Sequence, residues 1–167
     1  SKLMVDATAS IGLENDHGFA DVVFFSSCKG LFGPTGLGFI SHKQDIKKIK
    51  SKDFWYDHET HEKSKYTLGY NCIAALEKIS KKHSMYKKRL MFAKNFMKKY
   101  TLNKNYCPNI GIGLNRKINK KKLKKNTLLY IPRKNPGYDT IFFLGMIKFN
   151  KDEIRRYLKS YIISKFT

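Results

Sequence analysis

Two short apolar segments constrain the fold of this chain most strongly, and each is followed by a polar residue that could take part in a reaction. Residues 3–6 end in Asp6, and residues 19–26 form a second apolar run typical of a buried parallel strand. Lys29 follows the second run and lies 23 positions after Asp6. That separation is long enough for a crossover and a return into the same sheet. We therefore expect an α/β fold with both residues at the carboxyl ends of neighbouring strands, where open α/β sheets bind ligands.

Lys29 has the clearest chemical setting in the sequence. It ends a turn of two serines and a cysteine, and a glycine-rich hairpin over residues 33–38 follows it. A lysine held in this way can form a Schiff base with pyridoxal phosphate, which also needs an anion to keep its ring nitrogen protonated. A turn lysine or a strand-end aspartate alone is more often structural. The pair predicts that Lys29 is catalytic and that Asp6 and Lys29 bind pyridoxal 5'-phosphate.

These motifs resemble the class V aminotransferases, which are fold-type-I enzymes that use pyridoxal phosphate. The matching elements in the first half are residues 5–7 with Ser10 and Gly12, residues 26–29, and residues 33–39. Residues 107–112 and 129–134 resemble the start of the small domain in the 2-aminoethylphosphonate–pyruvate transaminases. The chain resembles that group of the family most, and the resemblance is more specific around Asp6 and Lys29 than after Lys104.

The resemblance implies a role for each matching residue. Lys29 would hold the cofactor aldehyde and then move a proton, in a buried cationic neighbourhood that activates its amine. Asp6 would anchor the ring nitrogen. Ser26 would contact the cofactor phosphate, with an ordinary turn hydroxyl as the alternative. Thr67 lies in a segment that resembles the one reaching the phosphate across the family's dimer, with a helix cap as the alternative. Cys28 is interpreted as a small buried filler.

The resemblance also implies a domain organisation. Residues 1–70 would be the C-terminal part of the pyridoxal-phosphate-binding large domain, residues 71–100 a connecting helix, and residues 101–167 a small C-terminal α/β domain. Family enzymes are considerably longer, and we identify no phosphate-binding loop ahead of Asp6. We therefore expect the C-terminal half of an enzyme, which forms a homodimer or pairs with an N-terminal half.

Hydrophobic periodicity and glycine positions predict the remaining elements. Helices are expected over residues 44–52, 71–100, 118–125 and 151–164. The long helix is expected to break near residues 83–84. Strands are expected over residues 36–41, 109–114, 127–132 and 140–148, and a loop over residues 54–65.

The substrate is less well defined than the cofactor. The resemblance implies transfer of an amino group between a small amine or amino acid and a keto acid. Phe143, however, stands where these transaminases carry an arginine that grips the substrate carboxylate, and Arg133 is a weaker replacement. A related lyase or decarboxylase is therefore the alternative enzyme. Cys107 lacks the sequence context expected for a desulfurase.

Charge and composition limit the partners. The net charge of +21 comes from 34 basic and 13 acidic residues, with a basic run over residues 116–126. The lysines are scattered and arginines are few, which favours compositional bias over specific nucleic-acid binding, although an inactive remnant acting as a basic interaction module is an alternative. His58 and His61 lack a third ligand cluster, so no metal site is predicted.

The same sequence gives an expectation for the cell compartment. It contains no membrane-spanning apolar run and no signal-peptide pattern near Ser1. Its three cysteines are widely spaced, which is typical of reduced thiols rather than disulfides. We therefore expect a cytoplasmic protein.

Overall fold

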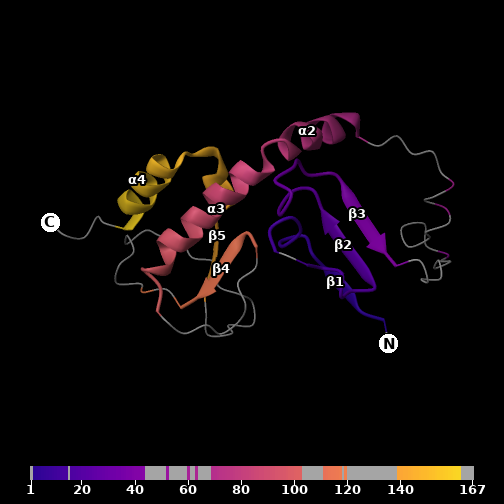
Figure 1. The fold of residues 1–167 in the computed structure, drawn as a ribbon, viewed down its shortest axis with the longest axis horizontal. Coiled ribbons are helices and arrows are strands. Elements are labelled where there is room, and N and C mark those ends of the chain that lie inside the picture. The colour runs from indigo at the N-terminus through magenta and orange to yellow at the C-terminus, as the bar shows by residue number, and fades with distance from the viewer. Residues whose placement is uncertain are drawn as a thin grey trace.

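The computed structural model describes residues 2–14, 16–43, 52, 60, 63, 69–102, 111–117, 119 and 139–162. Within them the fold is mixed α/β, with two small sheets and a pair of consecutive helices between them (Figure 1). The expected segment 127–132 lies outside the described residues, as do nearly all of 44–52, 54–65 and 118–125.

The first sheet contains three strands in the order β1 (Met4–Asp6), β2 (Val22–Ser26) and β3 (Gly38–His42). β1 pairs with β2 in parallel, from Met4 opposite Val22 to Asp6 opposite Phe24, whereas β3 pairs with β2 in the antiparallel direction. The expected parallel pairing of the first two apolar segments is confirmed. The central strand begins later than expected because Ala20 N–H closes a turn on His17 O at 3.1 Å.

The hairpin between β2 and β3 is closed by a buried serine. Ser27 has no exposed side-chain surface, and its hydroxyl donates to the backbone oxygens of Pro34 and Leu37. Gly33 N–H donates back to Ser27 O at 2.7 Å. Gly36, at the tip, has a φ of 113°, a conformation that glycine adopts without steric cost.

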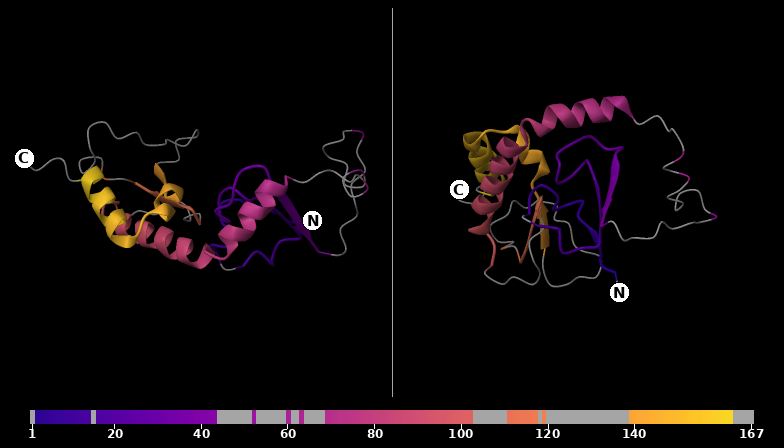
Figure 2. Two further views of the ribbon diagram at one scale, coloured as in Figure 1. Left: turned by 90° about the horizontal axis from the view of Figure 1, so that it is seen from above. Right: turned by 45° about the vertical axis from the view of Figure 1, so that its right-hand side comes forward.

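Two helices in sequence, α2 (Tyr70–Ser80) and α3 (His83–Lys98), lead from the first sheet to the second (Figure 2). The long helical segment was expected to have a break near residues 83–84, and the break is at Lys81 and Lys82. α3 carries the larger buried face, which includes Leu90, Ala93 and Met97.

The second sheet is a pair of antiparallel strands, β4 (Gly113–Arg116) and β5 (Asp139–Phe142). The strand expected over residues 140–148 is too long, because the chain leaves the sheet at Phe143 and forms a 3₁₀ helix, η3 (Leu144–Lys148). Phe143 N–H donates to Ile112 O at 3.0 Å and its ring is 2 % exposed. Burial of this ring therefore takes precedence over strand continuation.

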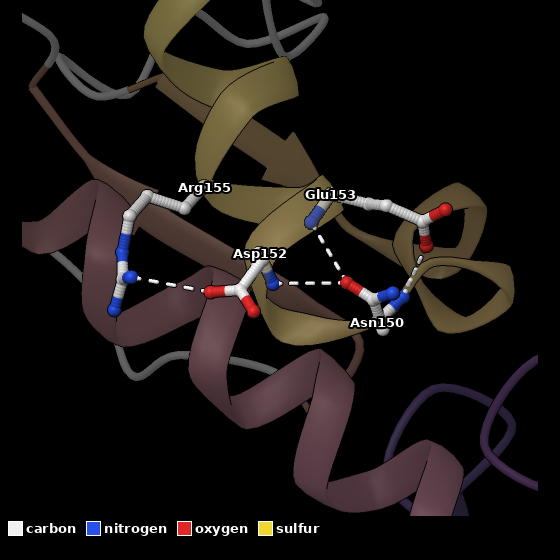
Figure 3. A network of polar contacts seen from close by, with 4 residues as sticks. All are labelled: Asn150, Asp152, Glu153 and Arg155. Carbon is white, nitrogen blue, oxygen red and sulfur yellow. Dashed lines mark hydrogen bonds and ion pairs between the residues drawn. The ribbon is translucent and has the colours of Figure 1, made fainter.

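The last helix, α4 (Lys151–Ile162), begins at a reciprocal cap (Figure 3). Asn150 Oδ1 accepts the backbone N–H groups of Asp152 at 3.0 Å and Glu153 at 2.9 Å. Glu153 Oε2 accepts Asn150 N–H at 2.7 Å. This is a capping box with asparagine in the first position, which satisfies backbone donors that a helix leaves free.

One hydrophobic cluster contains residues from both ends of the described chain. Leu13 and Phe32, next to the first sheet, belong to the same cluster as buried residues of α3, β4 and α4. The members of this cluster are Leu13, Phe32, Leu90, Ala93, Met97, Ile112, Leu114, Phe143, Ile154 and Leu158. A backbone hydrogen bond from Ile112 N to Ala9 O, at 3.1 Å, joins the two parts at the same place.

Within the described residues, every helix is too short or too polar to cross a lipid bilayer.

Candidate functional site

The carboxyl ends of β1 and β2 bring the two residues singled out from the sequence to one edge of the first sheet. Asp6 is the last residue of β1, and the turn that carries Lys29 starts directly after the last residue of β2, Ser26. The positive charge of Lys29 is one of the causes that lower the pKa of the Asp6 carboxyl. The predicted placement at neighbouring strand ends therefore agrees with the strand arrangement.

Asp6 is exposed at this edge, and Thr8 is its hydrogen-bonding partner. Thr8 N–H donates to Asp6 Oδ1 at 2.9 Å. The Thr8 side chain is the largest cause that holds the pKa of the Asp6 carboxyl below its ordinary value, followed by this backbone bond. Partial desolvation acts in the opposite direction, and the charge of Lys29 lowers the pKa further. Asp6 is thus an ionised carboxylate at neutral pH.

Thr8 was not recognised from the sequence as part of the site. A threonine two positions after a strand-end aspartate is a pattern that could have indicated it, because aspartate side chains often accept the backbone N–H two residues on. The contact from Thr8 to the second strand depends on the sheet, since Thr8 Oγ1 accepts the N–H of Ser26 at 3.3 Å.

Ser26 and Cys28 lie side by side at the start of the turn. The Ser26 hydroxyl and the Cys28 thiol are 3.2 Å apart, and both residues are half-buried. Sulfur is a weak hydrogen-bonding partner, so the Ser26 hydroxyl can exchange it for a stronger acceptor. Cys28 was expected to be a buried filler, and this expectation is met only in part because its side chain keeps some exposure.

Lys29 was expected in a buried cationic neighbourhood, and the structure corrects this expectation because its side chain is exposed. The turn carries Lys29 beyond the end of the sheet, and no described residue covers it. Its backbone is nevertheless fixed, since Lys29 O accepts Phe32 N–H at 2.9 Å. Phe32 adopts a left-handed φ of 59°, and its buried ring packs on His83 with 5.0 Å between ring centroids.

Several residues considered from the sequence are not part of the described structure. Thr67 lies outside the described residues, so its cofactor-binding role stays a prediction. The same holds for Cys107, Arg133, His58 and His61. Among the residues that the structure describes, no group of three or more His, Cys, Asp or Glu side chains could hold a metal ion.

A cavity of about 410 Å³ lies against the opposite face of the first sheet. Val23, Phe25 and Ser41 line it, and they alternate along their strands with Phe24 and Ile40, which share a face with Asp6. Its rim includes His17, Asp21, His42 and Lys43, together with Ile11, Gly18 and Ala20. Asp6, Ser26 and Lys29 are not among its described lining residues, so the cavity is separate from the Asp6–Lys29 edge.

The rim of this cavity is largely occupied by internal polar contacts. His17 Nε2 lies 2.8 Å from Ser10 Oγ, and Asp21 accepts Leu3 N–H at 2.8 Å while also facing Lys43 at 3.8 Å. These polar groups of the cavity are therefore engaged with one another.

Comparison with known proteins provides no functional assignment. No protein-family model, no curated protein and no solved structure matches this chain. The function therefore has to be inferred from the motifs of the sequence and from the residues gathered at the edge of the first sheet.

Proposed function

We propose that this chain is a pyridoxal-phosphate-dependent enzyme of the fold-type-I, class V aminotransferase lineage, similar to the 2-aminoethylphosphonate–pyruvate transaminases. The proposed reaction transfers an amino group between a small amine or amino acid and a keto acid. The observation that carries this proposal is the parallel pairing of β1 with β2, which brings an ionised Asp6 and Lys29 to one edge. An amine and a fixed anion are the two groups that this cofactor requires.

The residues at the edge fit the cofactor in charge and accessibility. Asp6 is exposed and holds its negative charge at neutral pH, as a partner of a protonated ring nitrogen must. The exposed amine of Lys29 is open to an aldehyde. Ser26 is the last residue of β2, and its hydroxyl is the described group suited to donate to a phosphate oxygen.

Each side chain then has a defined task. When bound, pyridoxal phosphate supplies an aldehyde and a ring that withdraws electrons from the substrate. Lys29 would bind the aldehyde carbon, yield it to the substrate amine, and then remove and return a proton at the substrate carbon. Asp6 would keep a proton on the ring nitrogen through its negative charge. Thr67 stays proposed as a further phosphate-binding residue.

The face of the sheet that carries Asp6 supports a shared site. Met4, Phe24 and Ile40 on this face are 61 %, 38 % and 57 % exposed, so apolar surface continues beside the carboxylate. We propose that a second copy of the chain, or an N-terminal half with a phosphate-binding loop, covers this face. Such a partner would also remove Lys29 from water.

Phe143 supports a second candidate reaction. Its ring is fully within the hydrophobic cluster, so the stretch in which family transaminases carry a carboxylate-gripping arginine provides no cation here. A related lyase or decarboxylase does not need that grip in the same form. The two reactions are distinguished by their products, because transamination requires a keto-acid acceptor and decarboxylation releases carbon dioxide.

The proposal is tested by fixing the cofactor to the protein. The purified chain is mixed with pyridoxal phosphate, its visible absorption is recorded before and after borohydride, and the labelled peptide is found by mass spectrometry. Lys29→Ala should lose the reduced adduct, whereas Lys78→Ala, which removes an exposed lysine from the last turn of α2, should keep it. Equal, weak labelling of both variants would contradict the proposal and favour an inactive, basic interaction module.

A further inference from the structure

Thr8 is hydrogen-bonded to all three segments that form the candidate site. Its backbone N–H donates to Asp6 Oδ1 at 2.9 Å. Its hydroxyl oxygen accepts Ser26 N–H at 3.3 Å, at the end of the neighbouring strand. Its carbonyl oxygen accepts Gly30 N–H at 3.0 Å, one residue after Lys29. One residue therefore connects the anion, the phosphate-binding candidate and the turn that carries the amine.

The Thr8 hydroxyl contacts the neighbouring strand as an acceptor. A threonine hydroxyl has one hydrogen to donate and lone pairs to accept with. Ser26 N–H can only donate, so it occupies a lone pair of Thr8 Oγ1 at the end of β2. The Thr8 side chain is also the largest cause that lowers the pKa of the Asp6 carboxyl.

The contacts of Thr8 connect the end of β2 with the Asp6 carboxylate. The Thr8 hydroxyl accepts Ser26 N–H, and the Thr8 backbone N–H donates to Asp6 Oδ1. Hydrogen bonds to a charged acceptor are stronger than neutral ones. The carboxylate is therefore held by a residue that is itself fixed from the neighbouring strand.

The turn beyond Lys29 depends on the same residue. Gly30 lies so close to the segment after β1 that a Cβ at this position would be 2.3 Å from Ile11 O. The bond from Gly30 N–H to Thr8 O fixes this close approach. Movement of Thr8 would therefore shift the backbone next to Lys29 as well as the carboxylate of Asp6.

We propose that Thr8 is the positioning residue of this site, which holds the Asp6 carboxylate and the Lys29 turn in a fixed relation through its hydroxyl and its backbone. The catalytic meaning of this inference rests on the proposed function of Asp6 and Lys29. The physical arrangement is independent of it, and this makes the two ideas separable by experiment.

The test compares Thr8→Val, which has nearly the shape of threonine but no hydroxyl, with Thr8→Ser, which keeps it. Thr35→Val is the matched control, because Thr35 lies exposed in the hairpin between β2 and β3. Far-UV circular dichroism establishes folding, and Thr8→Ala replaces Thr8→Val if valine is not accommodated. None of these variants removes Lys29, the charged group whose field acts on Asp6.

The first readout is an NMR titration of the Asp6 side-chain carboxyl. We expect its pKa to rise toward the ordinary value in Thr8→Val, and to stay low in Thr8→Ser and Thr35→Val. The second readout is borohydride-fixed labelling of Lys29 by pyridoxal phosphate, which should fall about fivefold in Thr8→Val, the loss expected for one neutral hydrogen bond, and recover in Thr8→Ser.

The outcomes separate the two proposals. An unchanged Asp6 pKa in Thr8→Val, or a rise of the same size in Thr8→Ser, would overturn the positioning role. A lack of specific Lys29 labelling in the unmodified chain would instead overturn the proposed function, and the Asp6 titration would still decide the role of Thr8.

Discussion

Replacing Gly30 by alanine should destabilise this chain, because an added Cβ would meet its neighbours more closely at Gly30 than at Gly33 or Gly111. The added Cβ would stand 2.3 Å from Ile11 O and 3.1 Å from both Ile11 N and Ile11 Cγ2. Ordinary contacts of a Cβ begin at 3.4 Å, so two backbone segments must separate by about 1 Å. Gly30 has no left-handed φ, and the cost is therefore steric rather than conformational.

The magnitude follows from the contacts that must be given up. Insertion of a methyl group into a packed site costs about 1–3 kcal/mol. Separating the segments also weakens the bond from Gly30 N–H to Thr8 O, and a backbone hydrogen bond contributes about 0.5–1.5 kcal/mol. We expect a loss of about 2–4 kcal/mol in the free energy of unfolding, a large share of the 5–15 kcal/mol of a typical domain.

Gly38→Ala is the matched control for this substitution. Gly38 is the first residue of β3, and a Cβ there meets no atom within 4 Å. Alanine should be neutral or stabilise by up to about 1 kcal/mol, because it reduces the freedom of the unfolded chain. Urea unfolding followed by far-UV circular dichroism measures both variants. Midpoints that agree to within about 0.5 kcal/mol, at equal slope, would refute the steric reasoning.

Four further predictions concern other parts of the molecule. Phe143→Arg should destabilise by at least the 3–5 kcal/mol typical of Phe→Ala in a core, and should create no carboxylate binding, as thermal unfolding and amino-acid titration would show. Asn150→Ala should cost about 1 kcal/mol in urea unfolding by removing the cap of α4, while Asn71→Ala on the exposed side of α2 should not. Folding lowers the pKa of Asp6, so its contribution to stability is present above the ordinary carboxyl pKa and is lost as pH falls through the folded value. The difference in unfolding free energy between the unmodified chain and Asp6→Asn, measured in urea from pH 7 to pH 2, should therefore vanish in acid. Burial lowers the pKa of Lys94, whose Nζ donates to Gly111 O, so stability should rise with pH between its folded pKa and the ordinary lysine value of 10.5, and this rise should be absent in Lys94→Met.

The edge of the first sheet was predictable from the sequence because its determinants are local. The apolar runs that end at Asp6 and Ser26 identify strands, and their separation allows the parallel pairing that the structure shows. The burial expected for the second run is not found along its whole length, because Val22 is buried but Phe24 is exposed. The break in the long helix was expected near residues 83–84, and it lies two residues earlier, at Lys81 and Lys82.

Features that depend on tertiary contacts could not be predicted in this way. The role of Thr8 requires knowledge of which backbone N–H faces its hydroxyl, and that N–H belongs to Ser26 on another strand. The exposure of Lys29 depends on what covers the turn. The prediction of a strand beyond Phe143 was wrong. The pattern of residues 140–148 does not indicate that Phe143 is buried, at 2 % exposure, or that the chain continues as η3.

The hydrophobic cluster that joins Leu13 and Phe32 to the C-terminal helices has a consequence for dissecting the protein. A piece that ended at residue 70 would remove the rest of the hydrophobic cluster that contains Leu13 and Phe32, and would leave Ala9 O without the N–H of Ile112. The remaining piece would lose two of its own core residues. Ala9 follows Thr8 directly, so the bond from Ile112, the residue before β4, supports the segment that holds the Asp6–Lys29 edge. Substitutions at Ile112 should therefore alter the position of the Lys29 turn although Ile112 is distant in sequence.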